Sequence, residues 1–148
     1  MKQHFHTLYR YNQWCNEQMI GLIAKNPNAY SERAKTLIGH TLNAHHIWIC
    51  RLQKIEPRHG VWDIFEIDEL LAYSQENFEA SLYVLERFDF EYILKYVNSK
   101  NETHNNRVKE ILFQIVNHST YHRGQLMSEL KTQGVSPIDL DFVYFKEV

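Results

Sequence analysis

The residues best suited to chemistry are two histidines, His118 and His122, in a long segment with helical apolar periodicity. On a helix, residues four apart share a face with their Cβ atoms roughly 5 to 6 Å apart, close enough for two imidazoles to bind one metal ion. The chain contains nine histidines, so a pair at this spacing also arises by chance. The alternative is that both rings are partly buried and hydrogen-bonded without a metal.

A catalytic metal site needs at least three protein ligands, so a third ligand must come from another helix. Two histidines of an earlier predicted helix are candidates. His40 lies on a face that adjoins the core, whereas His45 falls within an apolar stripe that includes Leu42 and Ile49. Periodicity alone slightly favours His45.

Arg123 directly follows the histidine pair and could clamp an anionic substrate. It points about 100° away from His122 around a helix, so a salt bridge or a dimer contact is an equally good interpretation. The two cysteines, Cys15 and Cys50, occupy separate apolar-rich segments, which suits reduced, buried thiols. Five histidines have no partner at ligand spacing and are expected at the surface: His4, His6, His46, His59 and His104.

Four segments show the period of amphipathic helices. The first covers residues 2–25, the second begins after Ser31 and continues to Leu52, the third begins at the cap Asp68 and continues to Leu85, and the fourth runs from about Val108 to Gly134. Packed together, these segments predict an all-α fold, an antiparallel four-helix bundle, and such bundles build metal sites from side chains on facing helices.

Residues 92–107 lack the helical period. The turn-rich tract 98–101 could join two short strands or form an ordered loop, so a short hairpin or loop is predicted before the last helix. The aromatic tail residues Phe142, Tyr144 and Phe145 are expected to pack back on the bundle.

The composition is that of one soluble domain. A chain of 148 residues with 44% hydrophobic content can bury about two thirds of its unfolded surface, so residues 1–148 are expected to form a single domain. The formal net charge of −2, with no run of like charges, argues against nucleic-acid binding. No segment approaches about 18 consecutive apolar residues and the N-terminus lacks a signal-peptide pattern, so a cytoplasmic protein without membrane contact is expected.

Several motifs match one family. They are the Tyr-Asn-Gln-Trp-Cys-Asn segment 11–16, His40 eight residues before Trp48, the segment 117–125, and Asp141 in the tail. Through them the chain resembles the DinB-like family of metal-binding four-helix bundles. The resemblance implies a divalent metal bound by His40, His118 and His122, and so favours His40 over His45. Position 45 is often acidic in such sequences, so a carboxylate near the site is missing here.

Three neutral imidazoles leave a divalent ion its full charge and open coordination positions, which suits activating a bound water or thiol and polarising an electrophile. Zn, Ni or Fe would fit an all-imidazole site. The resemblance implies a metal-dependent thiol transferase or hydrolase that acts on a small-molecule substrate with a low-molecular-weight thiol or water. In such an enzyme Arg123 would orient an anionic group. The alternative is a non-catalytic or stress-induced protein with a structural metal. Dimers are common among similar proteins, and a homodimer is expected.

Overall fold

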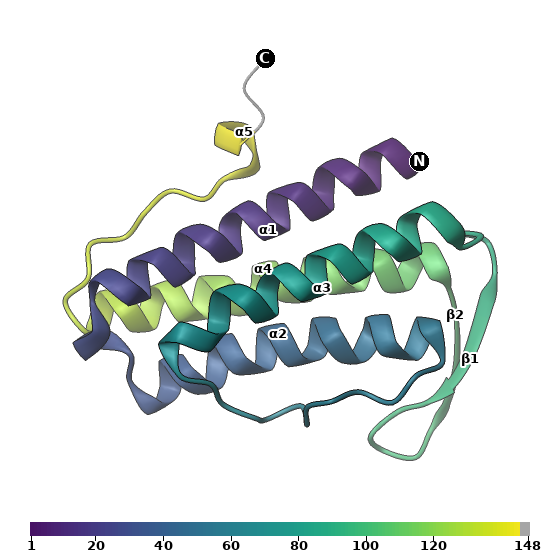
Figure 1. Ribbon diagram of the computed structural model, residues 1–148, viewed down its shortest axis with the longest axis horizontal. Coiled ribbons are helices and arrows are strands. Elements are labelled where there is room, and N and C mark those ends of the chain that lie inside the picture. The colour runs from purple at the N-terminus through teal and green to yellow at the C-terminus, as the bar shows by residue number, and fades with distance from the viewer. Residues whose placement is uncertain (146–148) are drawn as a thin grey trace.

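The computed structural model describes residues 1–145 and is mostly helical (Figure 1). The four long helices are α1 (Lys2–Lys25), α2 (Glu32–Gln53), α3 (Ile67–Arg87) and α4 (Val108–Thr132). The remaining elements are strands β1 (Ile93–Val97) and β2 (Thr103–Arg107) and the short helices η1 (Pro27–Ala29) and α5 (Phe142–Phe145). The all-α prediction is therefore roughly right, and the two strands form the antiparallel hairpin that was one of the two expectations before the last helix.

Local sequence explains where α2 and α3 begin. The Ser31 hydroxyl caps α2 by accepting a hydrogen bond from the backbone N–H three residues later, at 3.1 Å. The third helix begins at Ile67 rather than after the predicted cap Asp68. The Glu66 N–H donates to the Glu69 carboxylate at 2.8 Å, so this pair, not Asp68, satisfies the free backbone groups at the helix start.

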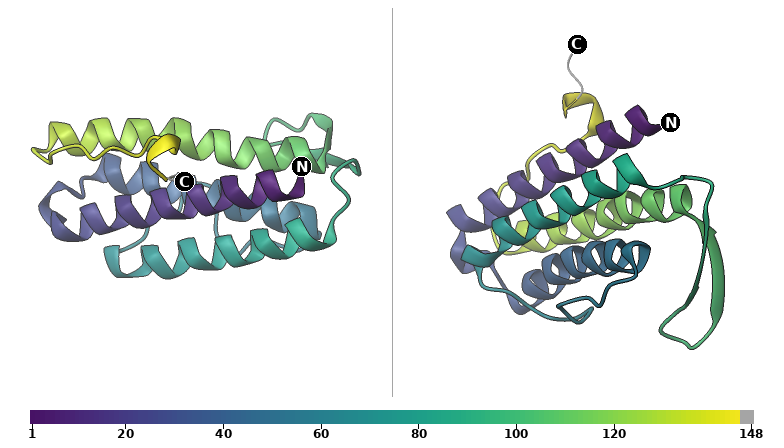
Figure 2. Two further views of the ribbon diagram at one scale, coloured as in Figure 1. Left: turned by 90° about the horizontal axis from the view of Figure 1, so that it is seen from above. Right: turned by 45° about the vertical axis from the view of Figure 1, so that its right-hand side comes forward.

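The four long helices do not all alternate in direction. α1 and α2 run antiparallel, as do α3 and α4, but α2 and α3 run parallel (Figures 1 and 2). Residues further along α2 meet residues further along α3, since Asn43 is hydrogen-bonded to Tyr73 and His45 to Ser81. The predicted antiparallel order is therefore wrong for this pair.

The connection between α2 and α3 explains the parallel pair. Residues 54–66, here called the crossover, leave the end of α2 and run back along it, so that His46 meets Arg58 and Asn43 meets Asp63. Fully extended, these residues span roughly 40 Å, which exceeds the about 33 Å length of α2. The antiparallel prediction assumed a short turn between α2 and α3. The crossover instead returns to the start of α2, so that α3 begins beside it and runs in the same direction.

The core consists of two hydrophobic clusters with a polar layer between them. One cluster includes Met19, Leu42 and Leu126, and the other includes Tyr9, Ile49 and Ile115. Along each long helix, most buried polar residues fall between the two clusters: Asn12, Gln13 and Asn16 on α1, Asn43 and His45 on α2, Ser74, Asn77 and Ser81 on α3, Ser119 and Arg123 on α4. Hydrogen bonds across this layer add directional contacts to the apolar packing of the helices.

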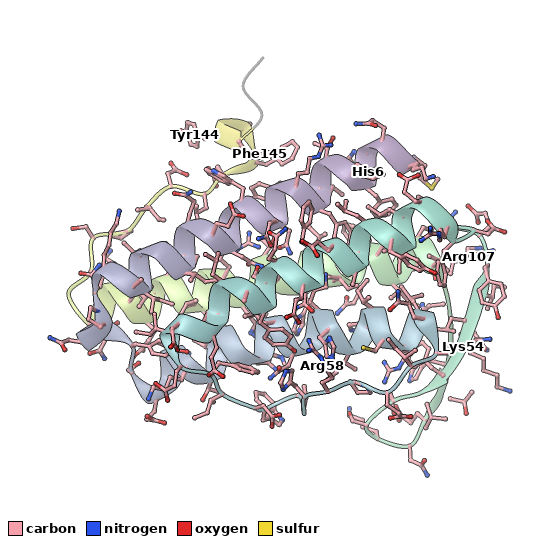
Figure 3. The ribbon with its side chains drawn as sticks, viewed as in Figure 1. His6, Lys54, Arg58, Arg107, Tyr144 and Phe145 are labelled. Atoms are coloured by element: carbon pink, nitrogen blue, oxygen red, sulfur yellow. The ribbon has the colours of Figure 1, made fainter. Side chains whose placement is uncertain are left out.

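The tail packs back on α1 through two of its three aromatic residues. The ring centres of Phe142 and Phe145 lie 5.1 and 5.7 Å from that of Tyr11. Tyr144 points away from α1 and is exposed, contrary to the prediction (Figure 3). The last residues of the tail, 146–148, lie outside the described residues. None of the described helices is long and apolar enough to cross a membrane.

Candidate metal centre

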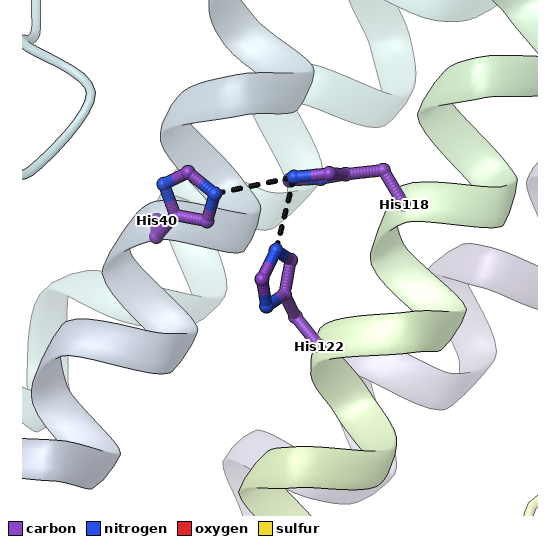
Figure 4. Close-up of side chains that lie close together, drawn as sticks. All are labelled: His40, His118 and His122. Atoms are coloured by element: carbon purple, nitrogen blue, oxygen red, sulfur yellow. Dashed lines mark hydrogen bonds between the residues drawn. The ribbon is translucent and has the colours of Figure 1, made fainter.

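Three histidines from two helices turn their rings toward one point. His40 on α2 meets His118 and His122 on α4 where these two antiparallel helices pack together (Figure 4). The Nε2 of His118 lies 3.1 Å from the Nε2 of His40 and 3.1 Å from the Nε2 of His122. One ligand atom from each ring lies within 4.8 Å of the other two. These residues, here called the triad, are positioned to hold one metal ion.

Oxygen acceptors fix the outer nitrogens of two triad rings. The Nδ1 of His122 lies 2.7 Å from the Gln125 amide oxygen, and the Nδ1 of His40 lies 3.3 Å from the Val61 carbonyl oxygen. Because both oxygens accept, each Nδ1 carries the proton, and each neutral ring then presents a lone pair at Nε2. Contacts of this kind orient metal-binding imidazoles and raise their basicity.

The surroundings favour the neutral form of two triad rings, His118 and His40. Burial, followed by repulsion from His122 and His40, lowers the pKa of His118 to about 4. Burial, followed by His122, also lowers the pKa of His40. Neutral imidazole is the form that binds metals. The Nε2 of His118 carries at most one proton, so it can donate to the Nε2 of His40 or to that of His122, but not to both. At least one of these two Nε2 atoms therefore has no donor within the triad. The donor set therefore fits a divalent ion better than a closed hydrogen-bonded cluster.

The crossover covers His40 from the other side. The Trp62 indole stacks on the His40 ring with 4.4 Å between ring centres and 17° between planes. The crossover reaches this position because Gly39 has no side chain: a Cβ there would lie only 2.6 Å from the Asp63 carbonyl oxygen. No signal in the sequence pointed to this contact, because periodicity does not report where a segment between helices packs.

An open pocket of about 730 Å³ adjoins the triad. His40 and His118 form part of its wall, Trp48 and Arg51 continue it along α2, and Tyr96 of the hairpin closes it. A larger hollow of about 820 Å³ lies between α1 and the start of α3 but contains no histidine. We call the pocket that borders His40 and His118 the triad pocket.

The structure places His45 away from the triad. Its Nε2 donates to the Ser81 hydroxyl at 2.7 Å, and Ser81 in turn donates to the Asn77 carbonyl oxygen. The ring packs edge-on against Tyr9, with 5.8 Å between ring centres. Complete burial lowers the pKa of His45 to about 3. The apolar stripe that favoured His45 thus reports a place in the core.

Arg123 is not brought to the triad either. Its side chain is only 7% exposed and lies between α4 and α1, where Nη2 donates to the Asn12 amide oxygen at 2.6 Å. It lines a separate cavity of about 180 Å³ together with Tyr11 and Asp141. The structure therefore gives Arg123 a contact between helices rather than a position from which to clamp a substrate at the triad.

Of the other histidines, His4 and His104 are exposed as predicted, whereas His6, His46 and His59 are only partly exposed. His46 Nε2 accepts the backbone N–H of Arg58 at 3.0 Å, and the His59 ring packs 4.9 Å from that of Tyr73. Both histidines hold the crossover against the helices.

Comparison with known proteins identifies the family of the chain. The model of the DinB family matches residues 1–148. The protein named Protein DinB from Bacillus subtilis (strain 168) is 24% identical over 157 aligned positions, which cover 91% of this chain and 89% of the relative. No solved structure matches with significance. Since the family model matches the whole chain, the chain belongs to the DinB family.

Proposed function

We propose that the triad binds one divalent metal ion and serves a reaction in which a low-molecular-weight thiol or water attacks a small electrophilic substrate. In this proposal the four packed helices act as a four-helix bundle, a scaffold that builds metal sites from facing helices. The observation that carries the proposal is the convergence of three Nε2 atoms beside an open pocket, with the Nδ1 protons of His40 and His122 bound elsewhere.

The residues around the triad support a catalytic role over a structural one. When bound, the ion supplies positive charge that polarises an electrophile and favours the anionic form of a thiol or water. Gln125 and the Val61 carbonyl hold two rings in the orientation for binding, and Trp48 and Trp62 give the pocket apolar walls. Structural zinc sites usually close with four protein ligands, whereas the group found within residues 1–145 has three.

Elemental analysis of the purified protein tests the metal part of the proposal. Wild type should carry one Zn, Ni or Fe ion per chain, since an all-imidazole site suits each of them. His40→Ala, His118→Ala and His122→Ala should each lose it, because two imidazoles bind loosely. His4→Ala and His45→Ala are the matched controls and should keep it. Unchanged occupancy in all three triad variants would refute the site, and loss in His45→Ala alone would move the third ligand there.

A panel of low-molecular-weight thiols and small electrophiles tests the reaction. Turnover should stop when a chelator removes the metal and return when the ion is restored. The triad variants should show no turnover under the same conditions. A protein that holds its metal but shows no metal-dependent turnover with any thiol, or with water, would speak for the structural alternative.

We also propose that the protein is a homodimer. Two aromatic side chains, Phe113 and Tyr121, lie on α4 and are 57% and 64% exposed, and a dimer formed through this helix would cover them. Sedimentation at micromolar concentration should give about twice the 17.8 kDa chain mass. Phe113→Asp should dissociate the dimer, whereas Ile55→Asp, at an equally exposed position outside α4, should not. A wild-type species of the chain mass would refute the proposal.

A further inference from the structure

We infer that Arg51 receives the negatively charged group of an elongated small molecule whose apolar body lies in the triad pocket. The inference rests on the proposed function, because it names the class of substrate that the triad would act on. It is carried by the position of Arg51, by the groups that hold it, and by the charges that line the pocket.

The position of Arg51 sets the length of the molecule. Arg51 follows His40 by eleven residues on α2, which places their Cα atoms about 16 Å apart along the helix axis. Long side chains on a helix lean toward its N-terminus, so Arg51 leans back toward the triad. Both residues line the same pocket. A molecule with a reactive group at the triad and a charged group at Arg51 would therefore be elongated.

Two aromatic rings hold the Arg51 guanidinium. Its central carbon lies 4.6 Å from the centre of the Trp48 ring and 4.8 Å from that of Tyr96. Stacking of this kind covers the faces of the guanidinium and leaves the N–H groups at its edge free to donate. Within residues 1–145, no carboxylate pairs with Arg51 and no side chain or carbonyl accepts from it, whereas Arg58 and Arg107 each pair with a glutamate. Two aromatic rings thus orient Arg51, and none of the residues 1–145 accepts a hydrogen bond from it.

The lining of the pocket selects the sign of the charge. Among the described residues, no aspartate or glutamate lines it, and its uncharged polar groups include Asn98, Ser99 and Gln114. Apolar surface comes from Ile47 and Val97 as well as the aromatic walls. A guanidinium matches a carboxylate, phosphate or sulfonate, and it binds such a planar or tetrahedral anion through paired N–H donors. The pocket therefore suits an anion with an apolar body and disfavours a cation.

Binding of two matched probes tests the inference. The probes are 4-phenylbutyrate and its neutral amide, titrated by calorimetry into the protein as purified and again after chelation of the metal. Wild type should bind the carboxylate on the order of tenfold more tightly than the amide, as expected for a hydrogen bond between charged groups. Arg51→Gln should lose this preference while its affinity for the amide is unchanged. Arg51→Lys should keep part of it, because the charge remains without the paired donors.

Arg10→Gln is the matched control, since it removes the same charge from an exposed position on α1, which does not line the pocket. It should preserve the preference. Equal affinity of wild type for both probes, no measurable binding of either, or a parallel loss of both in Arg51→Gln would overturn the inference, because Arg51 would then only shape the pocket.

The chelated samples separate this inference from the proposed function. A preference that survives in Arg51→Gln as purified and disappears on chelation would mean that the ion takes the carboxylate, and this too would overturn the inference. A protein that never holds metal would refute the proposed function alone, because an Arg51-dependent preference would persist in the absence of any ion.

Discussion

At the scale of the residue, the role of each histidine depends on what its second nitrogen contacts. His40 and His45 lie five residues apart on α2, yet His40 turns its Nε2 toward the imidazoles of His118 and His122, whereas His45 donates its Nε2 proton to Ser81. In His40 the proton is held at Nδ1 by the Val61 carbonyl. The outer contact thus determines which nitrogen is available to a metal.

Gln125 provides the same contact for His122, so it should tune the affinity of the triad. Replacing it in Gln125→Leu removes the acceptor of the Nδ1 proton and lets the ring rotate or change tautomer. We expect metal affinity to fall about 10- to 100-fold with the helices intact. Competition with a chelating dye measures the affinity, and circular dichroism checks the helices. Gln133→Leu, beyond the end of α4, is the control and should bind metal like wild type; an unchanged affinity in Gln125→Leu would contradict the role assigned to the amide.

His45 should make the stability of the fold depend on pH. Burial lowers its folded pKa to about 3, below the unfolded value near 6.5, so the neutral form is favoured in the fold. The contribution of His45 to the free energy of unfolding is therefore complete above about pH 6.5. It is lost as the pH falls from there toward about 3, because the unfolded chain binds a proton that the folded chain does not. Between pH 6.5 and 4.5 the free energy of unfolding should fall roughly 2 to 3 kcal/mol further in wild type than in His45→Gln, which keeps a donor to Ser81 but does not titrate.

Denaturant unfolding at several pH values measures this difference, with chelator present so that metal binding does not contribute. His4→Gln, at an exposed position on α1, is the control and should follow wild type. Parallel pH profiles for wild type and His45→Gln would show that burial of this imidazole has no such effect.

The sequence predicted part of the site at this scale. A spacing of four residues brings His118 and His122 together on any α-helix, so their pairing could be predicted. The third histidine could not be chosen from periodicity, because an apolar stripe reports burial and His45 is the more buried of the two candidates. The resemblance to the DinB-like family pointed to His40. Arg51 and Trp62 were missed because their partners come from a hairpin and a crossover that are distant in sequence.

At the scale of the elements, the crossover is the segment that sequence reasoning could not place. Helix periodicity predicted the four long helices closely, and Ser31 marked the start of α2, since both signals are local. The direction of α3 relative to α2 depends instead on the path of residues 54–66, which show no periodicity of their own. That path brings Val61 and Trp62 onto His40, so the topology of the helices and the geometry of the triad are connected.

Gly39 is the point at which this connection can be tested. A Cβ in Gly39→Ala would meet the Asp63 carbonyl oxygen at 2.6 Å, so the crossover must move away from α2. The clash should outweigh the higher helix propensity of alanine and destabilise the fold by about 1 to 2 kcal/mol. Metal affinity should fall as well, because Val61 and Trp62 shift with the crossover.

Gly21→Ala is the matched control for this prediction. Gly21 lies in α1 with no heavy atom within 4 Å of an added Cβ, so the same substitution should stabilise the fold by about 0.5 to 1 kcal/mol. Denaturant unfolding of both variants measures the change in the free energy of unfolding, which should be a loss in Gly39→Ala and a gain in Gly21→Ala. If Gly39→Ala were as stable as Gly21→Ala, the close packing of the crossover on α2 would be disproved.

At the scale of the whole molecule, the triad lies outside both hydrophobic clusters. Neither cluster contains a triad residue, and each cluster draws side chains from all four long helices. Hydrogen bonds of the polar layer, such as those of Asn16 to Ser74 and of Asn77 to the Leu42 carbonyl, join further pairs of helices without a metal. The fold therefore has its own sources of stability, and a bound ion would add to them.

Removing the metal should therefore show whether the ion is catalytic or structural, because only a structural ion is needed to keep the helices folded. We expect the chelated protein to keep the far-ultraviolet circular dichroism of the wild type, because a chain of this size buries enough apolar surface to fold alone. The free energy of unfolding should fall only by the linkage of an ion that binds the folded state, about 4 kcal/mol at a free-metal concentration of 1,000 times Kd, and the melting temperature should fall accordingly. His118→Ala without chelator is the matched sample and should show the same helix content and melting temperature as chelated wild type. If chelation instead unfolded α2 and α4, the ion would be holding the two helices together, and the catalytic role proposed for it would lose its main structural support.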